Sequence, residues 1–173
     1  GEAYTPAADV TLTPIFTQNT KTLADRKEPL TLKWSFRRDE GAPTIAVEGS
    51  GNGIGVWVTQ ATVDGETIDV KMDYDATSGK INNANNTDWA QMNNGTKLTI
   101  PSAKGAVVSM EAYNEISTTT IDGQSDYTHG NTISYNIANT AEAIDIVIGN
   151  GSHYRYIQAV LPPVQEEAGG KTY

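Results

Sequence analysis

The chain has 173 residues, of which 38% are hydrophobic, and carries a formal net charge of −9 at pH 7. This length suffices for one domain with a substantial core, whereas so acidic a protein is repelled by nucleic acids and anionic membranes. The chain contains no cysteine, which excludes disulfides, thiolate metal sites and cysteine catalysis, and no apolar run approaches the roughly 20 residues of a membrane span.

Alternation of apolar and polar residues recurs along the chain and predicts strands. The predicted strand over residues 30–36 places four residues on one face, Leu30, Leu32, Trp34 and Phe36. We expect this face in the core. Such strands recur at even spacing, about ten of them, and no segment keeps a helical period. They span residues 10–16, 30–36, 44–47, 56–63, 68–74, 97–100, 107–113, 118–121, 133–137, 144–148 and 154–161.

This pattern predicts an all-β fold, an antiparallel β-sandwich of the jelly-roll type. We expect one sandwich domain over residues 10–164, with a flexible arm at residues 1–9 and a tail or linker at residues 165–173. Asp64-Gly65 and Asp122-Gly123 predict tight turns, because such pairs readily adopt the left-handed backbone of two-residue hairpin turns.

The stretch between residues 63 and 100 is the candidate recognition region. Two predicted strands, residues 68–74 and 97–100, flank a polar loop that is rich in Asn and carries one large aromatic residue, Trp89. Asn and Gly tolerate left-handed backbone, and side-chain amides offer both donors and acceptors. A rigid sheet that presents such a loop suits recognition better than chemistry.

Aromatic composition indicates the kind of ligand. Eight Tyr and three Trp stand against two Phe. Tyr and Trp combine a flat apolar face with a polar group, which is what stacking on a sugar ring and bonding its hydroxyls require. The candidate sugar-binding residues are therefore three aromatics and the amides that follow Trp89 in the chain: Trp89, Trp57, Tyr154, Gln91, Asn93 and Asn94.

Each of these aromatics also has a structural interpretation. Trp57 points opposite to the two valines that flank it, toward either the core or the surface. Trp89 either stacks on a sugar or closes the end of the sandwich. Tyr154 and Tyr156 share one face of the last predicted strand, with Arg155 on the other, and form either a packed edge or a stacking platform.

Carboxylates provide a candidate metal site. Asp73, Asp75 and Asp88, together with the Asn-rich loop, offer the hard oxygen ligands that suit Ca²⁺, and no soft ligands for zinc accompany them. No EF-hand spacing is present, so a structural Ca²⁺ is an expectation from ligand chemistry alone. The other interpretation is a solvated strand face, and the predicted function requires no cofactor.

The sequence shows no catalytic motif. His129 and His153 lie in separate polar turns, and no nucleophile elbow of the GxSxG type is present. Asp73 and Asp75 share a strand face, but the carboxylates of a glycosidase normally come from different strands that face a cleft. We therefore expect that the chain is not an enzyme.

A resemblance to a known family rests on three segments, VDGETIDVKMDYDATSGK, DWAQMNNGTKLTIP and GSHYRYIQAV. They resemble an accessory β-sandwich module found beside catalytic domains in secreted bacterial pectate lyases and pectinesterases. Trp34-Ser35-Phe36 stands for a Trp-Asp-Phe-like triplet of that module, with Ser in place of the acidic residue. Residues 75–80 match its DATSGK in full, and residues 89–93 match its DAQFN-like loop, with Trp where an acidic residue is usual.

The resemblance covers about residues 30–161, with its motifs in the second half. It implies a fold similar to that of carbohydrate-binding modules and attachment to a polysaccharide-active enzyme. It transfers no particular ligand and no binding residue to this chain.

The leading hypothesis is a non-catalytic carbohydrate-binding module, secreted or at the surface of a bacterium. It would target an attached polysaccharide-degrading enzyme to plant cell-wall glycans such as pectin or xylan. Its expected partners are a polysaccharide or oligosaccharide and the covalently attached catalytic domain, with no nucleic acid and no membrane span. A neutral xylan, galactan or glucan fits the charge of the chain best. Anionic polygalacturonate requires bridging Ca²⁺ or a basic patch such as Lys33, Arg37 and Arg38.

Two alternatives stay open at this point. A structural or docking module would pack against a neighbouring catalytic domain without binding sugar, and would bury Trp89 and the Asn-rich loop in that contact. An enzyme in its own right would need a cleft with converging carboxylates or a metal.

Overall fold

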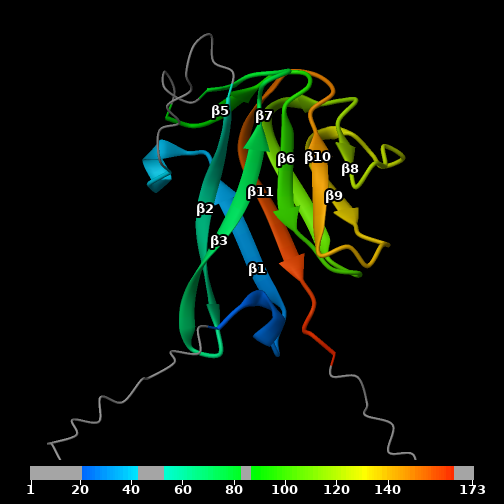
Figure 1. Ribbon diagram of the computed structural model, residues 1–173. Helices are drawn as coiled ribbons and strands as arrows, with labels where there is room; N and C mark the ends of the chain where they lie inside the picture. Colours follow the sequence, from blue (N-terminus) through cyan, green and yellow to red (C-terminus); the bar gives the residue numbers. More distant parts are fainter. Residues whose placement is uncertain (1–20, 43–52, 83–86, 166–173) are drawn as a thin grey trace, which may run out of the picture.

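Two antiparallel sheets packed face to face form the structure, a computed structural model that describes residues 21–42, 53–82 and 87–165 (Figure 1). The larger sheet has six strands: β1 (Leu30–Ser35), β4 (Ile81–Asn82), β5 (Ala90–Met92), β7 (Val107–Ile116), β9 (Gly130–Asn136) and β11 (Ser152–Leu161). The smaller has five: β2 (Ile54–Val63), β3 (Glu66–Asp75), β6 (Lys97–Pro101), β8 (Thr120–Ile121) and β10 (Ala143–Val147). The prediction of an all-β antiparallel sandwich is confirmed.

Strand β11 is central in the six-stranded sheet. One of its edges pairs with β7, which in turn pairs with β9. Its other edge is shared, because β5 pairs with Ser152 to Tyr154 and β1 pairs with Tyr156 to Leu161. Strand β11 therefore brings together segments that lie far apart in the sequence.

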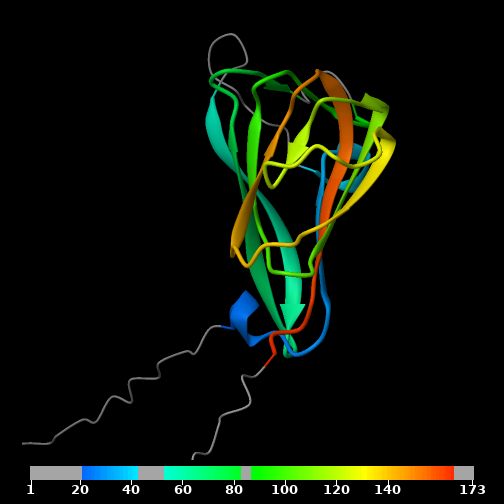
Figure 2. The ribbon, with the colours of Figure 1, turned by 90° about the vertical axis from the view of Figure 1, so that its right-hand side faces the viewer.

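The five-stranded sheet has the order β2-β3-β6-β10-β8. Figure 2 shows the two layers edge-on, with β3 and β10 in one and β1 and β11 in the other. Two short 3-10 helices, η1 (Leu23–Asp25) and η2 (Arg38–Glu40), flank β1 in the sequence. Among the described residues, no helix has the length and apolar character that crossing a bilayer requires.

The core lies between the sheets and follows from the alternation. Leu32, Trp34 and Phe36 are fully buried, as predicted, and Trp34 Nε1 donates a hydrogen bond of 3.3 Å across the sandwich to the carbonyl oxygen of Val70. Trp57 of β2 points inward and packs edge-on against Phe36, with the ring centroids 4.9 Å apart. Burying such aromatic and branched side chains is the main favourable term in folding.

The predicted strands at residues 30–36, 56–63, 68–74 and 97–100 correspond to β1, β2, β3 and β6. Those predicted at residues 107–113, 118–121, 133–137, 144–148 and 154–161 correspond to β7 to β11. Asp64-Gly65 and Asp122-Gly123 form the predicted turns, with φ of 51° and 82° in the first and 55° and 71° in the second. The strands predicted at residues 10–16 and 44–47, and the arm at residues 1–9, lie outside the described residues. The domain limits stay predictions.

Two expectations need correction. The insert between residues 81 and 96 was expected to be a loop, but it contains β4 and β5. These strands are only two and three residues long and form through pairing with each other and with β11, which overrides the local Asn-rich composition. The strand predicted at residues 118–121 begins only at Thr120, because Thr118 has a left-handed φ of 51°.

Candidate functional site

A bulge in β11 determines which side chains reach the outer face of the six-stranded sheet. Tyr154 lies opposite Ala112 of β7, but Tyr156 lies opposite Glu111, so Arg155 is an extra residue in the strand. Tyr154 is fully buried, whereas both Arg155 and Tyr156 stay partly exposed. The bulge therefore presents two consecutive side chains on the outside of the sheet.

Trp89, directly before β5, lies on this outer face against His153 of β11. The two ring centroids are 4.0 Å apart, with an angle of 61° between the rings. Nδ1 of His153 lies 2.6 Å from Oδ1 of Asn114 at the end of β7, a geometry in which the imidazole donates to the amide oxygen. The half-buried Trp89 ring is thus held by an imidazole that is itself fixed to the neighbouring strand.

The guanidinium of Arg155 is held by two carboxylates. Its Nη2 and Nε donate to Oδ2 of Asp88 at 2.8 and 3.2 Å, and its Nη1 donates to Oε1 of Glu111 at 3.1 Å. The hydrogen bonds to Asp88 and then Glu111 raise the pKa of Arg155. Asp88 also accepts an ion pair of 3.3 Å from Nε of Arg37. Because both carboxylate oxygens of Asp88 are bound by guanidinium groups, the orientation of Arg155 on the face is fixed.

Two tyrosines complete the face. Tyr113 of β7 is 63% exposed, and the guanidinium carbon of Arg155 lies 5.6 Å from its ring centroid. The ammonium of Lys33 lies 4.7 Å from the ring centroid of Tyr156, a cation–π contact. Burial, followed by the charge of Glu111, raises the pKa of Tyr156. We call the following set the aromatic face: Trp89, Tyr113, His153, Arg155 and Tyr156.

The aromatic face combines three kinds of group on one rigid sheet. Its rings offer flat apolar surfaces, its phenols and guanidinium donate hydrogen bonds, and Asp88 and Glu111 accept them. Such a surface suits a ligand that alternates apolar ring faces with hydroxyl groups.

Two of the six predicted binding residues, Trp89 and Gln91, lie on or beside the aromatic face. Gln91 of β5 is paired in register with His153 and lies between two buried neighbours, so its side chain points outward beside Trp89. Asn93 and Asn94 follow β5 in a turn in which the Thr96 amide donates to the Asn93 carbonyl oxygen at 3.1 Å, and Asn94 is exposed. Pairing of β5 with β11 is what brings Trp89 and Gln91 to the outer face.

Trp57 and Tyr154 require a correction. Trp57 is 2% exposed and Tyr154 is fully buried, so both rings belong to the core and neither faces a ligand. Trp57 is buried because side chains alternate along β2, and its flanking valines lie on the outer face. For Tyr154, the bulge separates it from Tyr156, which alternation had placed on the same face. The hydroxyl of Tyr154 instead lies 3.3 Å from Oγ1 of Thr119.

Alkaline destabilisation is expected from Tyr154. Burial raises its pKa from 10.0 to about 12. Between these two pH values the unfolded chain loses the phenolic proton and the folded chain keeps it. The contribution of Tyr154 to stability is therefore complete below pH 10 and falls by about 2–3 kcal/mol as the pH rises toward 12. Urea denaturation at a series of pH values measures this, and Tyr154→Phe should weaken the dependence, to which Tyr127 also contributes because burial raises its pKa to about 12. An unchanged dependence in Tyr154→Phe would contradict the assignment.

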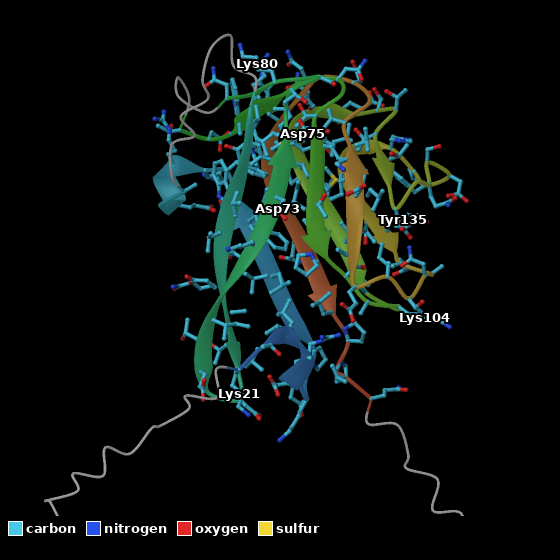
Figure 3. All side chains as sticks on the ribbon, viewed as in Figure 1. Lys21, Asp73, Asp75, Lys80, Lys104 and Tyr135 are labelled. Carbon is cyan, nitrogen blue, oxygen red and sulfur yellow. The ribbon has the colours of Figure 1, made fainter. Side chains whose placement is uncertain are left out.

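The three predicted metal ligands do not form one site. Asp73 and Asp75 lie along β3 in the five-stranded sheet (Figure 3), and Asp75 accepts hydrogen bonds from the backbone and the hydroxyl of Thr77. Asp88 is instead held by Arg155 and Arg37 beside the six-stranded sheet. Within residues 21–42, 53–82 and 87–165, no group of three or more His, Asp or Glu side chains is arranged to hold a metal.

Sequence reasoning missed most of the polar side of this face. Tyr113, Glu111 and Arg155 come from two strands whose pairing alternation does not reveal. The prediction that His153 lies in a polar turn is wrong, because this residue belongs to β11. The segment HYRY at residues 153–156 could have indicated the bulge, because its adjacent aromatic and charged residues fit a strand that a bulge interrupts.

Comparisons with known proteins give the chain no family. No protein-family model matches it, and no curated protein sequence matches it. Among solved structures it is similar to a chain from work entitled "The complexity of the Ruminococcus flavefaciens cellulosome reflects an expansion in glycan recognition". The two chains share 13% identity and a TM-score of 0.43, over 78% of this chain and 96% of the other. So distant a likeness does not bear on function, and the resemblance to accessory modules of pectate lyases stays a prediction.

Proposed function

We propose that the chain is a non-catalytic module that binds a glycan along the aromatic face. The observation that supports this most is the bulge at Arg155, which places Arg155 and Tyr156 outward beside Trp89, His153 and Tyr113. In this proposal sugar rings stack on Tyr113 and Trp89, and their hydroxyls bond to the charged groups between them.

Rigidity of the face favours binding without chemistry. The imidazole of His153 and the guanidinium of Arg155 are each held by neighbouring side chains, so little conformational entropy is lost when a ligand orders them. An open sheet surface of this kind gives a modest affinity, with Kd between about micromolar and millimolar, or about −8 to −4 kcal/mol.

Weak binding is useful when the module is part of a larger protein. We propose that the chain is attached to a polysaccharide-degrading catalytic domain in a secreted or cell-surface bacterial protein. Retention on an insoluble glycan would then raise the effective concentration of substrate at the attached active site. No cofactor is needed for this role.

Isothermal titration against a glycan panel tests the proposal. The panel contains xylan, galactan, a β-glucan and polygalacturonate. Each is titrated into the wild-type chain in the calorimeter cell. We expect saturable binding to at least one of them, with a Kd in the range given above. Heat changes indistinguishable from dilution for all four, confirmed by equal mobility in affinity gels, would overturn the proposal.

A second candidate function is docking to the attached catalytic domain. It is favoured by a row of exposed aliphatic side chains on β2, where Ile54, Val56 and Val58 are 74%, 47% and 44% exposed. These lie on the outer face of the five-stranded sheet, opposite to the aromatic face. In the full-length protein, Val56→Lys with Val58→Lys should separate the melting of the two domains if this row is a docking surface. An unchanged melting profile would exclude it.

A further inference from the structure

We infer that the glycan bound on the aromatic face is uncharged, and that polyuronates are disfavoured there. This inference rests on the proposed function and specifies the ligand class of the same site. It concerns neutral chains of hexoses or pentoses, in contrast to chains that carry a carboxylate on every sugar.

Both arginines beside the face are already bound by carboxylates. Arg155 contacts Asp88 and Glu111 at 2.8 and 3.1 Å. Arg37 contacts three carboxylates: Asp39 at 2.8 Å, Asp88 at 3.3 Å and Glu40 at 3.4 Å. A uronate that approached either guanidinium would meet a positive charge already balanced by carboxylates that stay close by.

The charge of this ion-pair network is negative. It contains two guanidinium groups and four carboxylates, those of Asp39, Glu40, Asp88 and Glu111, which leaves a net charge of −2. Lys33 adds one positive charge beside Tyr156. Of the predicted basic patch of Lys33, Arg37 and Arg38, Arg37 is therefore neutralised, and the chain as a whole carries −9. An approaching polyanion meets repulsion both at long range and on contact.

Hydroxyl groups match the network better. A carboxylate accepts at about four positions, and Glu111, which binds one guanidinium, has acceptor capacity beyond it. A sugar hydroxyl donates to such an oxygen and can accept from a neighbouring N–H, so neighbouring hydroxyls satisfy both partners without breaking an ion pair. Neutral ligands form no new ion pairs, so their affinity should depend little on salt.

The test compares neutral and acidic glycans at low and high salt by isothermal titration. Wild-type chain should bind a neutral glycan with a Kd that changes less than about twofold with salt, and polygalacturonate at least about tenfold more weakly. Glu111→Gln removes one negative charge and should raise the Kd for the neutral glycan about three- to tenfold. It should also reduce the ratio between the Kd for polygalacturonate and that for the neutral glycan. Glu142→Gln, an exposed residue between β9 and β10, makes the same charge change and should alter neither.

The possible outcomes separate the two proposals. Tighter binding of polygalacturonate than of every neutral glycan, with a strong salt dependence, would overturn the inference and leave glycan binding intact. Equal effects of Glu111→Gln and Glu142→Gln would also overturn it, because net charge alone would then explain the preference. Failure to bind any of the glycans would overturn the proposed function, and this inference with it.

Discussion

Replacing both Trp89 and Tyr113 by Ala is expected to weaken glycan binding about a hundredfold, since each stacking contact contributes about 1–2 kcal/mol. Tyr113 is 63% exposed and Trp89 is half-buried against His153, so both rings keep surface on which a sugar can stack. Isothermal titration with the tightest-binding glycan of the panel measures the loss. Each single variant should show about a tenfold loss.

The matched control lies on the other sheet. Val56→Ala with Val58→Ala also removes two exposed apolar side chains, from the outer face of β2, and should keep wild-type affinity. Thermal unfolding of both double variants shows whether a loss of affinity comes from lost glycan contacts or from a loss of folded protein. Wild-type affinity in the Trp89 and Tyr113 variant, or an equal loss in the valine variant, would contradict binding at the aromatic face.

Replacing Trp34 by Ala is expected to lower the free energy of unfolding by about 3–5 kcal/mol, because the deletion leaves a large cavity between the sheets. Trp34 is fully buried, and its indole spans from β1 to the Val70 carbonyl of β3. Urea denaturation monitored by circular dichroism measures the change.

Trp34→Phe provides the comparison. It keeps an aromatic ring in the core and loses the hydrogen bond of Nε1, so a smaller cost of about 1–2 kcal/mol is expected. If Trp34→Ala cost less than about 1 kcal/mol, the indole would not be the cross-sheet contact that the structure shows. Trp34 also pairs in register with Ile157, next to the bulge, so this part of the core supports the aromatic face.

Side-chain alternation was enough to predict the strands and the burial of Trp34 and Phe36, because a period of two fixes which residues face the core. It did not predict the two short strands in the Asn-rich insert. Their two- and three-residue lengths carry too little pattern. They form through pairing with each other and through pairing of β5 with β11, a strand about sixty residues further on.

The candidate site was only partly predictable for a related reason. Trp89 and Gln91 were selected from composition and do lie beside His153. The rest of the face depends on one inserted residue, Arg155, which turns Tyr154 inward and Tyr156 outward. A one-residue insertion of this kind reverses the face that simple alternation predicts for every later side chain of the strand, and local propensities do not reveal it.

Backbone amide chemical shifts of the isotope-labelled chain, followed during titration with the oligosaccharide of the best-binding glycan, test the site most directly. Glycan binding on the bulged sheet predicts that the largest changes fall in β5, the end of β7 and residues 153–156 of β11, with β2 and β3 unaffected. Changes centred on β2 and β3, or spread evenly over both sheets, would contradict it.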